Sequence, residues 1–137
     1  MTPWDRALAA EHAAIFAYGL IGAQLTGDAV NRARTAETAH RTRRDELILR
    51  STGSDIVPAQ AAYEVPFPVT DQASALRLAA EVEERSAAVW RDLLAATEGP
   101  QRESALTAMI EYAVRATQWR QTAGSTPVVP TWPGRPD

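Results

Sequence analysis

The chain has 137 residues, enough for one domain with a single core, and 45% of them are hydrophobic. The absence of cysteine excludes disulfides, thiolate zinc sites and cysteine nucleophiles, and a net charge of −3 without a basic half argues against a nucleic-acid partner. The N-terminus lacks the layout of a secretory signal, and the longest uncharged helical run, 13–26, is too short to span a bilayer comfortably, so we expect a soluble, cytoplasmic protein without a membrane partner.

Start and stop signals predict four helices. The first begins at Thr2 with proline at the next position, and Asp28 is expected to cap the second. Glycines end the first three predicted helices, and Pro100 stands in the first turn of the fourth, which stops before Gly124. The predicted ranges are about 2–25, 28–51, 70 or 71 to 99, and 100–123.

The connections between these helices differ greatly in length. Two links of two or three residues predict antiparallel hairpins, whereas the proline-rich stretch 54–70 is long enough to run the length of a bundle. Two hairpins joined by one long crossover define the ferritin-like topology. The sequence therefore predicts an all-α, ferritin-like four-helix bundle over residues 1–124, followed by a proline-rich tail over 125–137.

The two halves of the chain form a weak internal sequence repeat. Glu11 lies sixteen residues before Gly27, and Glu83 lies sixteen residues before Gly99. Tyr18 and Trp90 likewise stand nine residues before these glycines. This weak repeat relates the first predicted helix to the third.

Acidic side chains interrupt the inward stripes of three predicted helices. Glu11 and Glu83 stand among apolar or small residues at helical spacing, and Glu37 shares a face with His40 in the second helix. A carboxylate in such a stripe is costly unless it is paired, protonated or bound to metal. Three helices are thus expected to bring carboxylates to one level of the bundle.

One interpretation of this level is a metal site. The spacing Glu37-x-x-His40 is that of carboxylate-bridged di-iron bundles, which need a second such pair. In the fourth helix, Val114 stands where the second histidine would fall, three residues after Glu111. A mononuclear Fe, Mn or Zn site is therefore the expected form if a metal binds. Its candidate ligands are Glu11, Glu37, His40 and Glu83.

The expected apolar stripe of the fourth helix comprises Leu106, Met109, Ile110, Ala113 and Ala116.

The favoured interpretation is a buried salt-bridge network without a cofactor. Arg44 and Arg41 would neutralise the carboxylates, since arginine binds carboxylates bidentately and keeps its proton. The hydroxyl of Tyr18 would bond a carboxylate in the core. The predicted network comprises Glu11, Tyr18, Glu37, His40, Arg41, Arg44 and Glu83.

The segment 13–23 of the first helix is uncharged on every side. Phe16, Leu20 and Ala23 form a second apolar row that either the crossover or a second subunit would cover. We expect a homodimer on this basis.

Four segments carry a family resemblance. They are LAAEHAAIFAYGLIGAQL (8–25), HRTRRDEL (40–47), AAYEVPFPVTD (61–71) and AVRATQWR (113–120). Together they resemble an uncharacterised, alanine-rich family of ferritin-like domains, domain of unknown function 4439. The resemblance implies a ferritin-like bundle and no established activity. We therefore expect a non-enzymatic, dimeric bundle; the alternatives are a metal-binding or redox protein, and a small-molecule binder in the polar bundle cavity under the crossover.

Overall fold

A computed structural model describes residues 1–51, 55–130, 132 and 135 of the chain. Within these residues the protein is all-α and has no strand. The helices are α1 (Pro3–Ala23), α2 (Gly27–Arg50), α3 (Gln72–Ala95) and α4 (Gly99–Ala123). The predicted four-helix bundle is confirmed. The start of the expected crossover at residue 54, and residues 131, 133, 134, 136 and 137 of the expected tail, lie outside the described residues.

Local signals define the helix starts. The hydroxyl of Thr2 accepts the Asp5 N–H at 3.1 Å, and the carboxylate of Asp71 accepts the Ser74 N–H at 2.8 Å. The second and fourth helices instead begin at glycines of positive φ, Gly27 (61°) and Gly99 (58°). Within the described part of the chain no side chain caps α2, whose N-cap position is Thr26, so Asp28 is not the cap that the sequence predicted.

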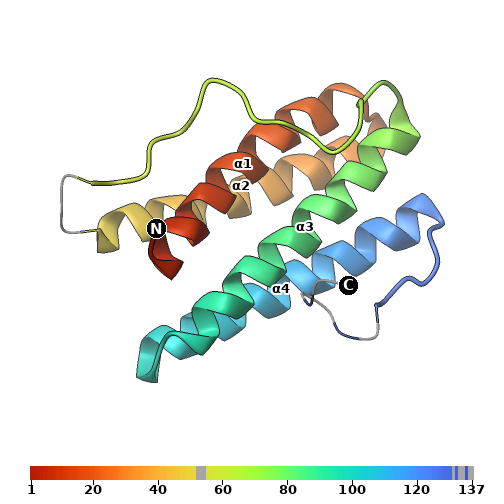
Figure 1. Cartoon of the computed structure of the whole chain (residues 1–137). Coiled ribbons are helices and arrows are strands. Elements are labelled where there is room, and N and C mark those ends of the chain that lie inside the picture. Colours follow the sequence, from red (N-terminus) through yellow and green to blue (C-terminus); the bar gives the residue numbers. More distant parts are fainter. Residues whose placement is uncertain (52–54, 131, 133–134, 136–137) are drawn as a thin grey trace.

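The two antiparallel hairpins, α1–α2 and α3–α4, pack against each other chiefly through α1 and α3 (Figure 1). The crossover between α2 and α3 runs over α1, and residues 125–130 turn back beside the end of α4 (Figure 1). None of the helices in the described part of the chain is long and apolar enough to cross a membrane.

The apolar core is divided into two clusters. One gathers around Ile21, Leu78 and Trp119, and the other around Leu47, Leu93 and Tyr112. Between them lie the buried polar side chains of Glu11, His40 and Glu83. The charged layer therefore sits in the middle of the bundle, with packed apolar side chains on both sides of it.

The inward rows of α2 and α4 differ from the predicted ones. In α4, Leu106 and Ile110 were expected inside, yet Ile110 is 50% exposed. The row that faces α3 carries two large aromatics and three alanines, so it buries more area and allows close helix packing. In α2 the inward row includes Ala36 in place of Glu37. The buried residues of the two helices are Ala33, Ala36, His40 and Leu47 in α2, and Ala105, Ala108, Tyr112, Ala116 and Trp119 in α4.

The crossover covers part of α1. Tyr63 packs against Phe16 with ring centroids 5.6 Å apart, and the carbonyl of Val57 lies 3.0 Å from Nε2 of His12. Val65 and Phe67 pack on the core cluster around Ile21. The apolar row of α1 that pointed to a second subunit is thus contacted by the chain itself at Phe16.

Candidate functional site

The centre of the bundle is an ion-paired bridge of three side chains from three helices. Glu11 of α1, His40 of α2 and Glu83 of α3 are all 0% exposed. Nδ1 of His40 lies 2.6 Å from Oε2 of Glu11, and Nε2 lies 3.0 Å from Oε1 of Glu83. The imidazole therefore stands between the two carboxylates and contacts each with a different nitrogen.

This geometry determines the protonation state of His40. An ionised carboxylate can only accept hydrogen bonds, so both ring nitrogens must donate, as they do in the imidazolium form. Burial by itself lowers the pKa of His40, but the charge of Glu83 and the hydrogen bonds from both carboxylates outweigh it and raise the pKa from 6.5 to about 9. His40 is thus a buried cation at neutral pH.

Aromatic donors complete the coordination of Glu11. Its Oε1 accepts the indole N–H of Trp90 at 2.8 Å and the hydroxyl of Tyr112 at 2.6 Å. The ring of Tyr112 also stacks on that of His40, with centroids 4.7 Å apart and planes 5° from parallel. Glu11 is thereby bonded to residues of α2, α3 and α4.

Glu83 has a matching set of partners. Its Oε1 accepts the hydroxyl of Tyr18 at 2.5 Å, and its Oε2 accepts Nη1 of Arg115 at 3.3 Å. The Tyr18 oxygen accepts in turn from the indole of Trp119 at 3.0 Å. All four oxygens of the two buried glutamates therefore have a donor. The two negative charges are matched by His40 and Arg115.

Both tyrosines are held as neutral donors. Burial raises the pKa of Tyr18 well above 10, and the charge and hydrogen bond of Glu83 raise it further. Burial and Glu11 raise the pKa of Tyr112 in the same way. Because an ionised phenol could not donate to a carboxylate, these shifts keep both tyrosines as donors at neutral and mildly alkaline pH.

Three residues of the predicted network lie outside it. The side chain of Glu37 is 28% exposed and bonds Arg41 at 3.3 Å, one turn along the same helix. Arg44 contacts Asp45 instead of a buried carboxylate. The prediction failed because the row through Ala36 faces inward, which turns Glu37 and Arg44 toward the edge of the bundle. The structure does bring together Glu11, Tyr18, His40 and Glu83.

Two residues of the centre that were not predicted, Tyr112 and Arg115, are related to residues of α2 by the same internal repeat. His40 lies thirteen residues after Gly27, and Tyr112 lies thirteen residues after Gly99. The repeat therefore gives Tyr112 in α4 the position that His40 holds in α2, and this signal is present in the sequence. The same count pairs Arg43 with Arg115, sixteen residues after each glycine.

Arg43 of α2 contacts residues of α3 and α4 beside the polar centre. It forms an ion pair with Glu111, and its guanidinium lies 5.5 Å from the ring of Trp90 and 5.7 Å from that of Tyr112. Such contacts between a cation and aromatic faces are attractive. Arg43 thus covers the aromatic donors of the centre from the outside.

The donor set does not fit a metal in this arrangement. A histidine ligand must offer an unprotonated ring nitrogen, and both nitrogens of His40 face carboxylates. Among the described residues, no group of three or more histidine, aspartate and glutamate side chains is arranged to hold an ion. Glu37, the fourth ligand expected from the sequence, points elsewhere.

A separate cavity lies under the crossover. It measures about 240 Å³ and is lined mainly by apolar side chains of α1, α3 and the crossover, among them Phe16, Tyr63 and Leu78. The sequence predicts a polar cavity under the crossover that could hold a small molecule. This cavity does lie under the crossover, but its lining is mainly apolar.

A protein family and a solved structure resemble the chain over most of its length. The family described as domain of unknown function (DUF4439) matches residues 4–137. The crystal structure of a conserved hypothetical protein, rv2844, from Mycobacterium tuberculosis shares 34% sequence identity and a TM-score of 0.82, covering 88% of this chain and 93% of the other. Among curated proteins, none matches the sequence.

Proposed function

We propose that this chain, which belongs to the DUF4439 family of domains of unknown function, is a non-enzymatic, ferritin-like bundle protein whose polar centre is filled by its own cations. One observation carries the proposal: both ring nitrogens of the fully buried His40 are taken up by carboxylates. The imidazolium occupies the position between Glu11 and Glu83 that a bridging cation would need.

The ferritin-like assignment is supported by the connectivity of the helices. Two antiparallel hairpins joined by a long crossover distinguish this topology from the simple up-and-down bundle. In carboxylate-bridged members of that topology, glutamates and histidines project inward at one level to hold metal. Here the same level contains Glu11, Glu83 and His40, and the repeat places Tyr112 where a second histidine would stand.

Charge balance favours a structural role for this centre. Two carboxylates, one imidazolium and the guanidinium of Arg115 sum to zero without any added ion. Removing one member of such a buried set leaves another charge bare, so the network fixes the relative positions of all four helices. Its role would be to hold the bundle in one packing arrangement.

Metal binding or redox activity at Glu11, His40 and Glu83 is the alternative. It would require His40 to lose a proton before a nitrogen could serve as a ligand, so metal uptake would compete with protons. This requirement makes the two functions distinguishable by experiment.

The test is titration of chelator-free protein with Fe(II), Mn(II) and Zn(II) at pH 7, followed by calorimetry and elemental analysis. We expect no stoichiometric uptake by the wild type. The matched variants are His40→Gln and His12→Gln, since these are the two histidines of the chain. One equivalent of metal bound by the wild type and by His12→Gln, and lost in His40→Gln, would establish the alternative and overturn the proposal.

The homodimer and the cytoplasmic location stay predictions. The dimer was inferred from the apolar row of α1, and Phe16 of that row packs on Tyr63 of the crossover. A small-molecule ligand in the bundle also stays a prediction.

A further inference from the structure

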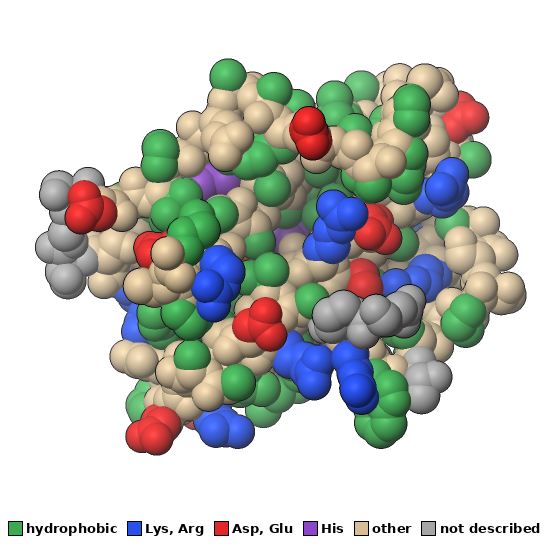
Figure 2. All heavy atoms as spheres, in the orientation of Figure 1, with side chains coloured by type: hydrophobic (Ala, Val, Ile, Leu, Met, Phe, Trp, Pro, Cys, Tyr) green, Lys and Arg blue, Asp and Glu red, His purple; other side chains and the backbone are tan. Residues whose placement is uncertain are grey.

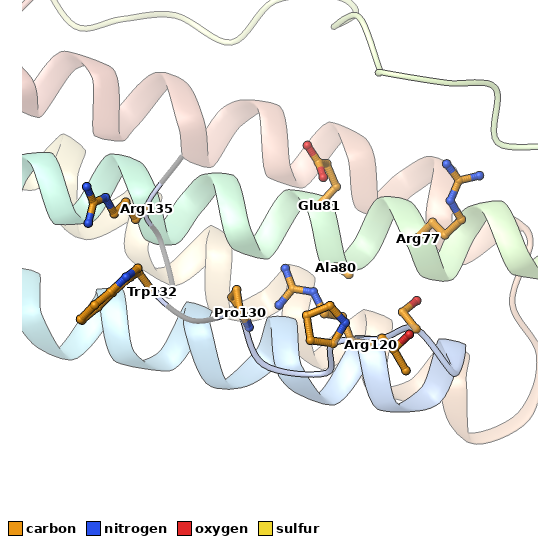
Figure 3. Close-up of a pocket in the computed structure, with 10 residues that line it drawn as sticks. Arg77, Ala80, Glu81, Arg120, Pro130, Trp132 and Arg135 are labelled. Carbon is orange, nitrogen blue, oxygen red and sulfur yellow. The ribbon is translucent and has the colours of Figure 1, made fainter. Parts of the chain in front are cut away.

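A cleft of about 720 Å³ lies between α3, the end of α4 and the tail (Figure 3). This volume is within the range of cavities that hold small organic ligands. Among the described lining residues are three arginines, one from α3, one from α4 and one from the tail. Figure 2 shows several basic side chains gathered on one face of the molecule.

Arg120 has an unused hydrogen-bonding group at this cleft. Its side chain is 17% exposed, and Nη2 donates to Oε2 of Glu84 at 3.2 Å. Nη1 is buried and has no acceptor among the described residues. A guanidinium cannot lose its proton at neutral pH, so this N–H keeps its need for an acceptor. In Figure 3, Arg120 rises from α4 toward α3 in the middle of the cleft.

The rest of the lining adds positive charge and hydroxyl groups. Arg77 and Arg135 lie toward opposite ends of the cleft in Figure 3, and Arg77 is held by stacking on Phe67 at 4.3 Å. Ser125 and Thr126 contribute hydroxyls. The single acidic lining residue described, Glu81, is already paired with Arg85 at 3.0 Å.

An aromatic face lies near one end. Trp132 lines the cleft on the same side as Arg135 and is largely exposed (Figure 3). A flat ring could stack on this indole while a charged group of the same molecule reaches Arg120.

We propose that this cleft binds a small organic anion, with a phosphate or carboxylate group on Arg120 and a flat apolar portion against Trp132. Binding would give the buried N–H of Arg120 its acceptor after a small rotation of the guanidinium into the cleft. The site lies outside the polar centre, so the proposal does not depend on the function proposed for that centre.

The probes are phenyl phosphate and benzoate, with inorganic phosphate to separate the charged group from the ring. Calorimetric titration of the full chain is compared with Arg120→Gln and with Arg34→Gln, which removes an exposed arginine of α2 remote in sequence from the cleft residues. We expect saturable binding of at least one aromatic probe, weakened by about tenfold or more in Arg120→Gln through loss of a charge-assisted hydrogen bond, and unchanged in Arg34→Gln.

A second variant guards against misfolding of Arg120→Gln. Arg135 is an exposed tail residue outside the four helices, so Arg135→Gln should leave the far-ultraviolet circular dichroism spectrum as in the wild type. It should still weaken binding of the probes, because Arg135 lines the cleft. A preference for phenyl phosphate or for benzoate would identify the charged group. The absence of saturable binding for every probe, or equal weakening in Arg34→Gln, would overturn the proposal.

Discussion

Each buried glutamate of the centre is held by three donors from different helices. Glu11 accepts from His40, Trp90 and Tyr112, and Glu83 accepts from His40, Tyr18 and Arg115. Moving a carboxylate out of water costs several kcal/mol, and only such a complete set of partners offsets it. At the residue scale, the stability of the protein therefore depends on whether a glutamate belongs to this set.

The substitution Glu83→Gln tests this dependence. It removes one of two negative charges beside the imidazolium and Arg115, and we expect a loss of about 3–5 kcal/mol in the free energy of unfolding. Glu37→Gln is the matched control. Glu37 is partly exposed and, among the described residues, paired with Arg41 alone, so its loss should cost less than about 1 kcal/mol. Urea unfolding followed by circular dichroism measures both, and equal effects would refute this account of the centre.

At the scale of the elements, small residues determine how the helices meet. The inward row of α4 combines three alanines with Tyr112 and Trp119, and the hairpin turns end at Gly27 and Gly99. Alanine permits close helix approach, and glycine permits the positive φ that reverses the chain within a three-residue link. Both hairpins therefore have a glycine of positive φ at equivalent positions of the repeat, Gly27 and Gly99.

Substitution of alanine for glycine should have opposite effects in the turn and in the helix. Gly27→Ala forces a Cβ into the left-handed region, and we expect a loss of about 1–2 kcal/mol. Gly19→Ala lies inside α1, where a Cβ would meet nothing within 4 Å, and should stabilise the protein by up to about 1 kcal/mol. Thermal and urea unfolding provide the measurement; the same sign for both variants would contradict the geometry assigned to the turn.

At the scale of the whole molecule, folding is coupled to proton uptake. His40 has a pKa of about 9 in the folded chain against 6.5 when unfolded, because the assembled helices place it between two carboxylates. A raised pKa contributes stability that is fully present below pH 6.5 and is lost as the pH rises through 9.

The free energy of unfolding should therefore fall between pH 6.5 and 9, by on the order of 3 kcal/mol. Urea unfolding across this range in His12→Gln should reproduce the fall, and His40→Gln should abolish it. A flat profile in the wild type would show that His40 is not the proton-binding cation. The phenols of Tyr18 and Tyr112 do not interfere, because burial raises the pKa of each well above 10.

The sequence alone determined the number of helices, their approximate ends and the two-hairpin connectivity. Caps, glycines, prolines and loop lengths act locally, so they can be interpreted without knowing what packs against them. It also placed Glu11, His40 and Glu83 on inward faces, because each interrupts a stripe of apolar or small residues. The division into a bundle over 1–124 and a tail over 125–137 stays a prediction.

Only the tertiary structure decided which cations meet the carboxylates. In α2, and likewise in α4, two neighbouring rows of side chains are similar in apolar character. Rotating α2 about its axis by a fraction of a turn replaces Glu37 and Arg44 on the inward face by Ala36 and Arg43. That choice depends on how Trp90, Tyr112 and Trp119 fill the space between helices far apart in the sequence. Helical period constrains one helix at a time, whereas the partners of a buried charge are selected by the packing of all four.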